Sequence, residues 1–140
     1  MFFLALCWWC REAKINMELY LIRHGIAADR DTYPNDEERP LTDKGHEKTA
    51  KVAKQLRDRG LRFDLILTSP LVRAKETATI LKEAGIAAQV EEFAALAPDG
   101  DIKAWVDWLE ERQHTSSGDK CLALVGHQPD LGNWAETLVW

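Results

Sequence analysis

The stretch that most constrains this chain is a short apolar strand that ends in an arginine, a histidine and a glycine, residues 19–25. Its first four residues, Leu-Tyr-Leu-Ile, are bulky and apolar, as in a strand that is buried in a sheet. Arg23 and His24 follow at once, so the strand would carry a cation and a titratable imidazole at its tip. Gly25 then lets the backbone turn sharply and approach a ligand closely. This combination predicts one wall of a ligand site.

The length and charge of the chain limit what that ligand can be. A chain of 140 residues fits one domain with a core of its own. The formal net charge of -5 gives no reason to expect nucleic acid or an anionic membrane surface as a partner. Any anionic ligand would therefore be held by a local cluster of cations. The three cysteines are an odd number without a secreted framework, which predicts a reducing, cytoplasmic location.

The N-terminal residues 1–16 look foreign to the rest of the chain. Their apolar run is too short to span a bilayer and has neither a basic residue before it nor a cleavage site after it. Cys7 and Cys10 have the C-x-x-C spacing, but they lack the second pair of ligands that a zinc site needs. We therefore expect an N-terminal extension outside the fold and a domain at 17–140. A chain that begins at Met17 is expected to fold and to keep its function.

Strands and helices alternate along the rest of the chain. Short continuous apolar runs predict the strands, and apolar residues at helical spacing with suitable caps predict the helices. The predicted strands are 19–22, 63–68, 87–91 and 121–125, and the predicted helices are 43–59, 71–83, 102–109 and 131–138. This alternation predicts an α/β fold with three layers, α/β/α, around a mostly parallel central sheet. The chain stops at Trp140 inside an apolar pattern, so we expect the domain to be incomplete at its C-terminus.

Three of the predicted strands end in residues that are reactive or that bind anions. These are Arg23-His24-Gly25, then Ser69 followed by Arg73, and then Gly126-His127. In parallel sheets, ligands bind outside the carboxyl ends of the strands, where helix starts also offer free N–H groups. Guanidinium groups match the oxygens of a phosphoryl group in pairs and stay charged at any working pH. Two arginines and two histidines at one edge therefore predict a phosphoryl site.

The same residues carry a family resemblance. The chain resembles the histidine phosphatase superfamily, which has the phosphoglycerate mutase-like fold, and within it the SixA-like phosphohistidine phosphatases. The matching segments, in consistent order, are Leu21-Ile22-Arg23-His24-Gly25, Arg39-Pro40-Leu41-Thr42, Leu67-Thr68-Ser69-Pro70 with Arg73, Leu96-Ala97-Pro98-Asp99-Gly100 and Val125-Gly126-His127-Gln128-Pro129. The resemblance spans residues 17–140. Members of this family usually continue into one or two further strands that complete the edge of the sheet.

The resemblance implies a role for each site residue. His24 would be the nucleophile that forms a phosphohistidine enzyme, which water then hydrolyses. The implied catalytic residues are His24, Arg23, Arg73 and His127, and the implied substrate-binding residues are Arg39, Gly25, Ser69 and Gly126. The chemistry agrees, because an imidazole offers a neutral nitrogen near pH 7 and covalent catalysis divides one hard step into two. No metal or cofactor is expected, because the cations supply the neutralising charge.

One departure from the family pattern bears on the substrate. Phosphoglycerate mutases and acid phosphatases of the superfamily place a carboxylic general acid in a Leu-x-Glu setting, whereas here Leu96-Ala97 is followed by Pro98. An alkoxide leaving group would depart slowly without such an acid, whereas the imidazole of a phosphohistidine is a less demanding leaving group. The departure therefore favours an N–P substrate. Nearby carboxylates that could still transfer a proton are Glu91, Glu92, Asp99 and Asp101.

These observations lead to one expected function and two alternatives. We expect a phosphatase that removes the phosphoryl group from phosphohistidine on a signalling protein, such as a phosphotransfer domain. The first alternative is a phosphomonoesterase of the same superfamily that acts on a small molecule. The second is a phospho-ligand binding module without catalysis. The acidic loop at 29–38 is expected to be solvated surface, and the oligomeric state is not read from the sequence.

Overall fold

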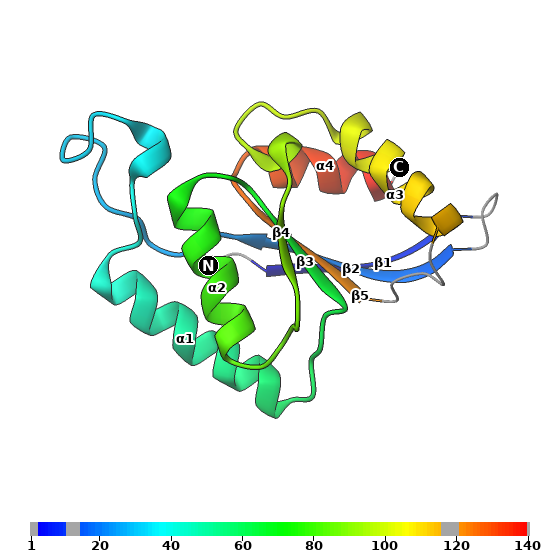
Figure 1. The fold of residues 1–140 in the computed structure, drawn as a ribbon, viewed down its shortest axis with the longest axis horizontal. Helices are drawn as coiled ribbons and strands as arrows, with labels where there is room; N and C mark the ends of the chain where they lie inside the picture. The colour runs from blue at the N-terminus through cyan, green and yellow to red at the C-terminus, as the bar shows by residue number, and fades with distance from the viewer. Residues whose placement is uncertain (1–2, 11–14, 116–120, 140) are drawn as a thin grey trace.

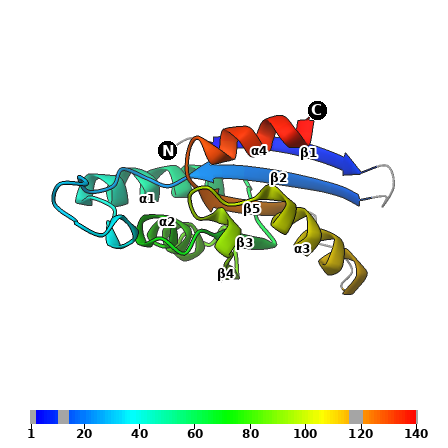
Figure 2. The same cartoon turned by 90° about the horizontal axis from the view of Figure 1, so that it is seen from above.

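The chain folds around one five-stranded sheet that carries helices on both faces (Figures 1 and 2). The computed structural model describes residues 3–10, 15–115 and 121–139. The elements in chain order are β1 (Phe3–Cys10), β2 (Ile15–Arg23), η1 (Asp36–Glu38), α1 (Asp43–Asp58), β3 (Leu65–Thr68), α2 (Val72–Glu83), β4 (Val90–Glu92), η2 (Ala94–Leu96), α3 (Ile102–Thr115), β5 (Cys121–Gly126) and α4 (Asp130–Val139). The predicted α/β/α architecture is confirmed.

The sheet has the strand order β1-β2-β5-β3-β4. The strands β2, β5, β3 and β4 run parallel to one another, and β1 is antiparallel to β2. The pairing of β2 with β5 ends at Arg23 opposite Gly126, and β3 pairs with the other side of β5. The ends of β2, β5 and β3 therefore meet at one edge, as expected of parallel strands.

The N-terminal segment differs from expectation. Residues 3–10, which we expected to lie outside the fold, form the edge strand β1 and pair with β2 from Phe3 opposite Ile22 to Cys10 opposite Ile15. The physical reason is that β2 begins at Ile15 and would otherwise present a row of unpaired backbone groups at the edge of the sheet. The antiparallel strand β1, which precedes β2 in the chain, satisfies these backbone groups. That a chain beginning at Met17 folds stays a prediction.

Apolar side chains fill the space on both faces of the sheet. On the face toward α1 and α2 the buried cluster is Ile22, Ala53, Phe63, Ile66, Ala74, Ala78, Leu81, Ile86, Ala87, Ala123 and Val125. On the face toward α3 and α4 it is Met17, Leu19, Leu21, Leu65, Leu67, Leu96, Trp105, Leu109, Leu122, Leu124, Leu131, Trp134 and Ala135. Successive residues of a strand belong to opposite clusters, so a strand that is buried on both faces reads as a continuous apolar run.

The boundaries of the helices follow the caps that the sequence offers. Thr42 caps α1, because its hydroxyl oxygen accepts a hydrogen bond from the backbone N–H of Gly45 at 2.9 Å. The helices predicted at 43–59 and 71–83 are confirmed as α1 and α2. The strand predicted at 87–91 is displaced, since Ala87 makes only an isolated bridge with Phe63 and β4 begins at Val90. Residues 116–120, between α3 and β5, lie outside the described residues.

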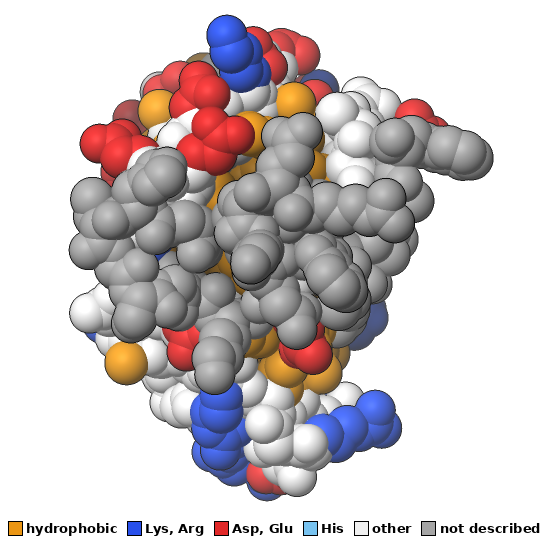
Figure 3. All heavy atoms as spheres, turned by 90° about the vertical axis from the view of Figure 1, so that its right-hand side faces the viewer, with side chains coloured by type: hydrophobic (Ala, Val, Ile, Leu, Met, Phe, Trp, Pro, Cys, Tyr) orange, Lys and Arg blue, Asp and Glu red, His pale blue; other side chains and the backbone are white. Residues whose placement is uncertain are grey.

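Figure 3 shows the end of the sheet away from the tip of β2, where acidic side chains gather at the top around a Lys or Arg side chain, and further Lys and Arg side chains lie at the bottom, toward α1. The strand tips that carry Arg23 and His24 lie at the opposite end, beside η1 (Figure 2). Within residues 3–10, 15–115 and 121–139, no helix has both the length and the apolar character needed to cross a membrane.

Candidate active site

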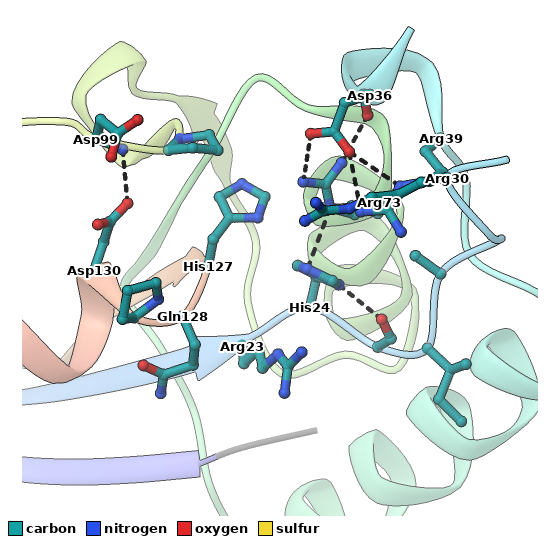
Figure 4. A pocket seen from close by; sticks show the side chains of 15 residues that line it. Arg23, His24, Arg30, Asp36, Arg39, Arg73, Asp99, His127, Gln128 and Asp130 are labelled. Atoms are coloured by element: carbon teal, nitrogen blue, oxygen red, sulfur yellow. Dashed lines mark hydrogen bonds and ion pairs between the residues drawn. The ribbon is translucent and has the colours of Figure 1, made fainter. Parts of the chain in front are cut away.

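A pocket of about 570 Å³ opens at the carboxyl ends of the strands (Figure 4). Its lining residues are Arg23, His24, Gly25, Ile26, Ala27, Arg30, Asp36, Arg39, Arg73, Pro98, Asp99, His127, Gln128, Pro129 and Asp130. Six of the eight predicted site residues are in this lining. The other two, Ser69 and Gly126, lie behind it and contact His127 and His24 respectively. The structure therefore gathers residues from three strand ends at one place.

The turn after β2 is held tightly between the two helices of one face. Gly25 is buried, and a Cβ atom at this position would lie 2.5 Å from the hydroxyl oxygen of Thr49 on α1. The backbone N–H of Gly25 donates to the hydroxyl oxygen of Thr77 on α2 at 3.1 Å. A side chain at this position would force α1 or the turn to move, which explains the glycine. The turn fixes where the preceding imidazole points.

His24 has a defined tautomer. Its Nδ1 lies 2.7 Å from the carbonyl oxygen of Gly25, and because a carbonyl only accepts, Nδ1 carries the proton. Burial lowers the pKa of His24 to about 4, the hydrogen bond to Gly25 opposes this shift, and the charges of Arg73 and Arg23 add to it. The ring is therefore neutral near pH 7, and Nε2 has a lone pair. That lone pair accepts a hydrogen bond from Nε of Arg73 at 3.2 Å.

Arg73 reaches the pocket from the first turn of α2, and its side chain is only 4% exposed. Its Nε faces His24, while Nη1 donates to the backbone oxygen of Asp36 at 2.8 Å and Nη2 pairs with the carboxylate of Asp36 at 3.1 Å. Arg73 is therefore not a solvated charge on the helix surface. This guanidinium joins α2, the loop after β2 and the imidazole of His24.

His127 lies across the pocket from His24, with the two ring centroids 5.1 Å apart. Its Nε2 lies 2.8 Å from the hydroxyl oxygen of Ser69, which also accepts the backbone N–H of Leu71 at 3.2 Å. The Nδ1 atom of His127 is buried and has no hydrogen-bond partner among the described residues. Burial, followed by the charges of His24 and Arg73, lowers the pKa of His127 to about 3. Nδ1 is therefore a polar atom on the pocket wall that a ligand can satisfy.

The family assignment rests on a comparison that covers this site. The family model described as histidine phosphatase superfamily (branch 1) matches residues 19–97, which is more than half of the chain. The matched segment contains the tip of β2 and Arg73. The chain belongs to the histidine phosphatase superfamily. Membership supports a phosphatase activity.

Relatives with known names or structures agree with this membership. An uncharacterized protein of Picosynechococcus sp. is 51% identical over 124 residues, which are 89% of this chain and 74% of that protein. The phosphohistidine phosphatase SixA of Escherichia coli is 28% identical over 120 residues, which are 83% of this chain and 70% of SixA. The structure of the protein histidine phosphatase SixA complexed with tungstate has a TM-score of 0.73 at 26% identity, covering 85% of this chain and 74% of that one. The fold is phosphoglycerate mutase-like.

Asp36 lines the pocket, although the sequence did not predict it as a site residue. We expected the loop at 29–38 to be solvated surface, but the carboxylate of Asp36 pairs with both Arg73 and Arg39 at 3.1 Å. Burial would raise the pKa of Asp36, yet the charges of Arg73 and Arg39 outweigh it and hold that pKa below its ordinary value. The sequence signal was weak: Asp36 stands three residues before Arg39, within a run of acidic residues that all look alike.

The opposite wall of the pocket consists of backbone turns and carboxylates. Asp99 has a φ of 66°, and its N–H donates to the carboxylate of Asp130 at 2.8 Å. Of the four carboxylates proposed for proton transfer, Asp99 lines the pocket, whereas Glu92 pairs with Lys75 outside it. Asp130, the first residue of α4, was not predicted, although an acidic residue in a first helical turn after Gly126-His127 was a readable signal.

The charges in the pocket are unevenly distributed. The lining holds four arginines against three aspartates, and Asp36 stands between two of those arginines while Asp99 and Asp130 stand on the other wall (Figure 4). Among the residues that the structure describes, no three His, Cys, Asp or Glu side chains cluster closely enough to hold a metal ion. The arrangement can therefore bind an anion beside His24 with guanidinium groups, an imidazole and backbone N–H groups.

Proposed function

We propose that the protein is a metal-independent phosphatase that removes the phosphoryl group from phosphohistidine through a covalent phospho-His24 intermediate. The observation that carries this proposal is the tautomer of His24. Its Nδ1–H is held by the carbonyl of Gly25, so the lone pair of Nε2 lies in a pocket that arginines line. A neutral nitrogen nucleophile beside fixed cations is what attack on a phosphoryl group requires.

In the first step the lone pair of His24 Nε2 attacks phosphorus and a P–N bond forms. The P–N bond to the substrate imidazole breaks, and its electron pair goes to the leaving nitrogen, which takes up a proton from solvent. The phosphoryl oxygens replace His24 as the partner of Arg73 Nε and bind Arg23, which is exposed at the pocket wall. Fixed charges at these oxygens stabilise the charge that develops in the transition state.

In the second step water attacks the phosphorus of phospho-His24. A P–O bond forms and the P–N bond to His24 breaks, so the electron pair returns to Nε2 and inorganic phosphate leaves. We propose that His127 takes part in both steps as a donor, with the hydroxyl of Ser69 donating to its Nε2 so that Nδ1 carries the proton and donates to a phosphoryl oxygen. Its lowered pKa does not prevent this, because the neutral imidazole keeps one N–H.

The proposed N–P substrate rests on two supports. One is the missing Leu-x-Glu acid at Leu96-Ala97-Pro98, a segment in which Pro98 itself lines the pocket. The other is the similarity to SixA, a phosphohistidine phosphatase by name. By the same similarity we propose that the substrate is a phosphohistidine on a protein, such as a phosphotransfer domain. The small-molecule alternative shares the chemistry of His24 but needs a proton donor for an oxygen leaving group.

A trapping experiment tests the proposal. The protein is incubated with a radiolabelled phosphohistidine-bearing phosphotransfer domain, quenched in alkali, in which a phosphohistidine survives, and analysed for label on the chain. Label that maps to the peptide with His24 is the expected result. Turnover of the same donor is then compared with turnover of glycerol phosphate. Faster turnover of glycerol phosphate would favour the small-molecule alternative, and no label from either compound would contradict the enzyme proposal.

A further inference from the structure

The Asp36 carboxylate stands where two guanidinium groups meet. One of its oxygens pairs with Nη2 of Arg73 at 3.1 Å, and the other pairs with Nε and Nη2 of Arg39, each at 3.1 Å. Its backbone oxygen also accepts from Nη1 of Arg73 at 2.8 Å. Figure 4 shows Asp36 above the arginines, with Arg73 between it and His24. Asp36 thus restrains both Nη atoms of Arg73 and the edge of the Arg39 guanidinium formed by Nε and Nη2.

This contact opposes a repulsion within the site. Burial lowers the pKa of Arg73, Asp36 acts in the opposite direction, and the positive charge of Arg39 lowers that pKa further, as expected of two like charges held close together. Before a phosphoryl group is bound, Asp36 is the carboxylate that compensates both arginines. Arg73 is nearly buried whereas the side chain of Asp36 is 46% exposed, so the loop residue restrains a side chain that α2 already positions.

The consequence reaches the nucleophile. A guanidinium held at both Nη atoms has little freedom left, and Arg73 uses its remaining Nε to contact Nε2 of His24 at 3.2 Å. The loop that bears Asp36 is itself held in place, because Nη1 of Arg39 donates to the backbone oxygen of Ala28 at 2.9 Å and Asn35 caps η1. The chain of contacts therefore runs from the loop at 26–41 through Asp36 and Arg73 to His24.

We propose that Asp36 is a positioning residue that holds Arg73 and Arg39 as a preformed phosphoryl clamp aligned with Nε2 of His24. This inference rests on the proposed phosphatase function. It adds that the clamp is ordered before the substrate arrives and that its order comes from the loop after β2. Misplacement of such a group by about 1 Å can cost about 100-fold in rate.

The test compares Asp36→Asn, Asp36→Glu and the matched control Glu38→Gln. Glu38 lies in the same turn, is exposed and carries the same charge, so its loss removes a charge without touching the clamp. Three quantities are measured: the Kd for orthovanadate by calorimetry, and kcat and KM for a phosphohistidine peptide. We expect Asp36→Asn to weaken vanadate binding by about 10-fold and to lower kcat/KM by about 10- to 100-fold, the usual effect of losing hydrogen bonds to a charged group.

The other variants separate positioning from a general effect of charge or folding. Glu38→Gln should stay within about 2-fold of the wild type, since surface changes away from special contacts have small effects. Asp36→Glu keeps the carboxylate and should recover part of the loss. The ¹⁵N signal of Arg73 Nε should shift in Asp36→Asn at an unchanged Tm, which a merely structural role would not produce.

Two results would overturn the inference in distinguishable ways. If the wild type binds vanadate and forms the phosphoenzyme while Asp36→Asn matches it, or binds vanadate more tightly, the positioning role is wrong and the phosphatase proposal stands. If the wild type itself neither binds vanadate nor accepts label, the phosphatase proposal fails and the positioning role fails with it.

Discussion

The pocket contains two neutral histidines, and the comparison between them shows how one residue type can supply the two functions proposed here. His24 and His127 both follow the ends of neighbouring parallel strands, and burial lowers the pKa of both, to about 4 and about 3. The difference lies in their hydrogen bonds. His24 donates through Nδ1 to a carbonyl and keeps Nε2 as an acceptor, whereas the Nε2 of His127 is engaged by Ser69 and Nδ1 faces no partner among the described residues.

In the proposed mechanism, the second hydrogen-bond partner of each imidazole decides its role. A carbonyl oxygen that accepts a hydrogen bond from one ring nitrogen leaves the other nitrogen with a free lone pair, which suits a nucleophile. A hydroxyl group that donates to one nitrogen makes the other an N–H donor, which suits a group that binds phosphoryl oxygens. The predictions below test this division of roles, beginning with the largest expected effect.

Removing the nucleophile should have the largest effect. His24→Ala should abolish labelling by a phosphohistidine donor and lower turnover by more than about 1,000-fold, since the covalent route is lost. The label is measured after an alkaline quench. His46→Ala is the matched control, because His46 is an imidazole outside the pocket that pairs with Glu76. Label that persists in His24→Ala and disappears in His46→Ala would reverse the assignment.

Removing the donor should slow both steps without removing the covalent intermediate. His127→Ala should lower kcat by about 100-fold, the usual effect of losing one donor to transition-state charge. His127→Gln retains an N–H group and should lose less. Rapid-quench measurement of label should still find phospho-His24 in both variants. A label in the wild type that maps to the peptide with His127 rather than His24 would contradict this division of roles.

Removing the hydroxyl that is proposed to donate to Nε2 of His127 should have a smaller effect. Ser69→Ala leaves both histidines in place but frees Nε2 of His127, so the proton can occupy either nitrogen. We expect a decrease in kcat of about 10-fold, in line with the loss of one buried hydrogen bond. Steady-state kinetics provide the measurement, with Ser69→Thr as the variant that keeps the hydroxyl. Equal rates for Ser69→Ala and the wild type would contradict the proposed role of the hydroxyl.

The smallest of these effects is expected for the free energy of unfolding as the pH is lowered from neutrality. Because the pKa values of both histidines are lowered in the folded chain, the unfolded chain takes up protons near pH 6.5 and the folded chain only near pH 4 and 3. The free energy of unfolding should therefore decrease as the pH falls from about 6.5 toward 4, while both rings stay neutral. NMR titration of the ring protons measures the two pKa values on which this expectation rests. A midpoint near 6.5 for either ring would contradict the burial argument.

Much of the fold and of the site could be predicted because the relevant signals are local. Four strands and four helices follow from apolar periodicity and caps such as Thr42, and the confirmed architecture follows from their alternation. The rule for parallel strands then brought His24, Arg73 and His127 to one edge, and all three line the pocket. The sequence did not predict that β1 pairs with β2 or that Asp36 pairs with Arg73. Local patterns do not indicate such contacts between separate segments.

The sequence alone determined which chemical groups stand at the strand ends, because strand tips, caps and turns depend on neighbouring residues. The tertiary structure decided what those groups do. The hydrogen bond from Arg73 to His24 joins residues 49 apart in the chain, and the one between Ser69 and His127 joins residues 58 apart. Tautomers, lowered pKa values and the restraint of Arg73 by Asp36 depend on distances and burial that exist only after the strands have paired.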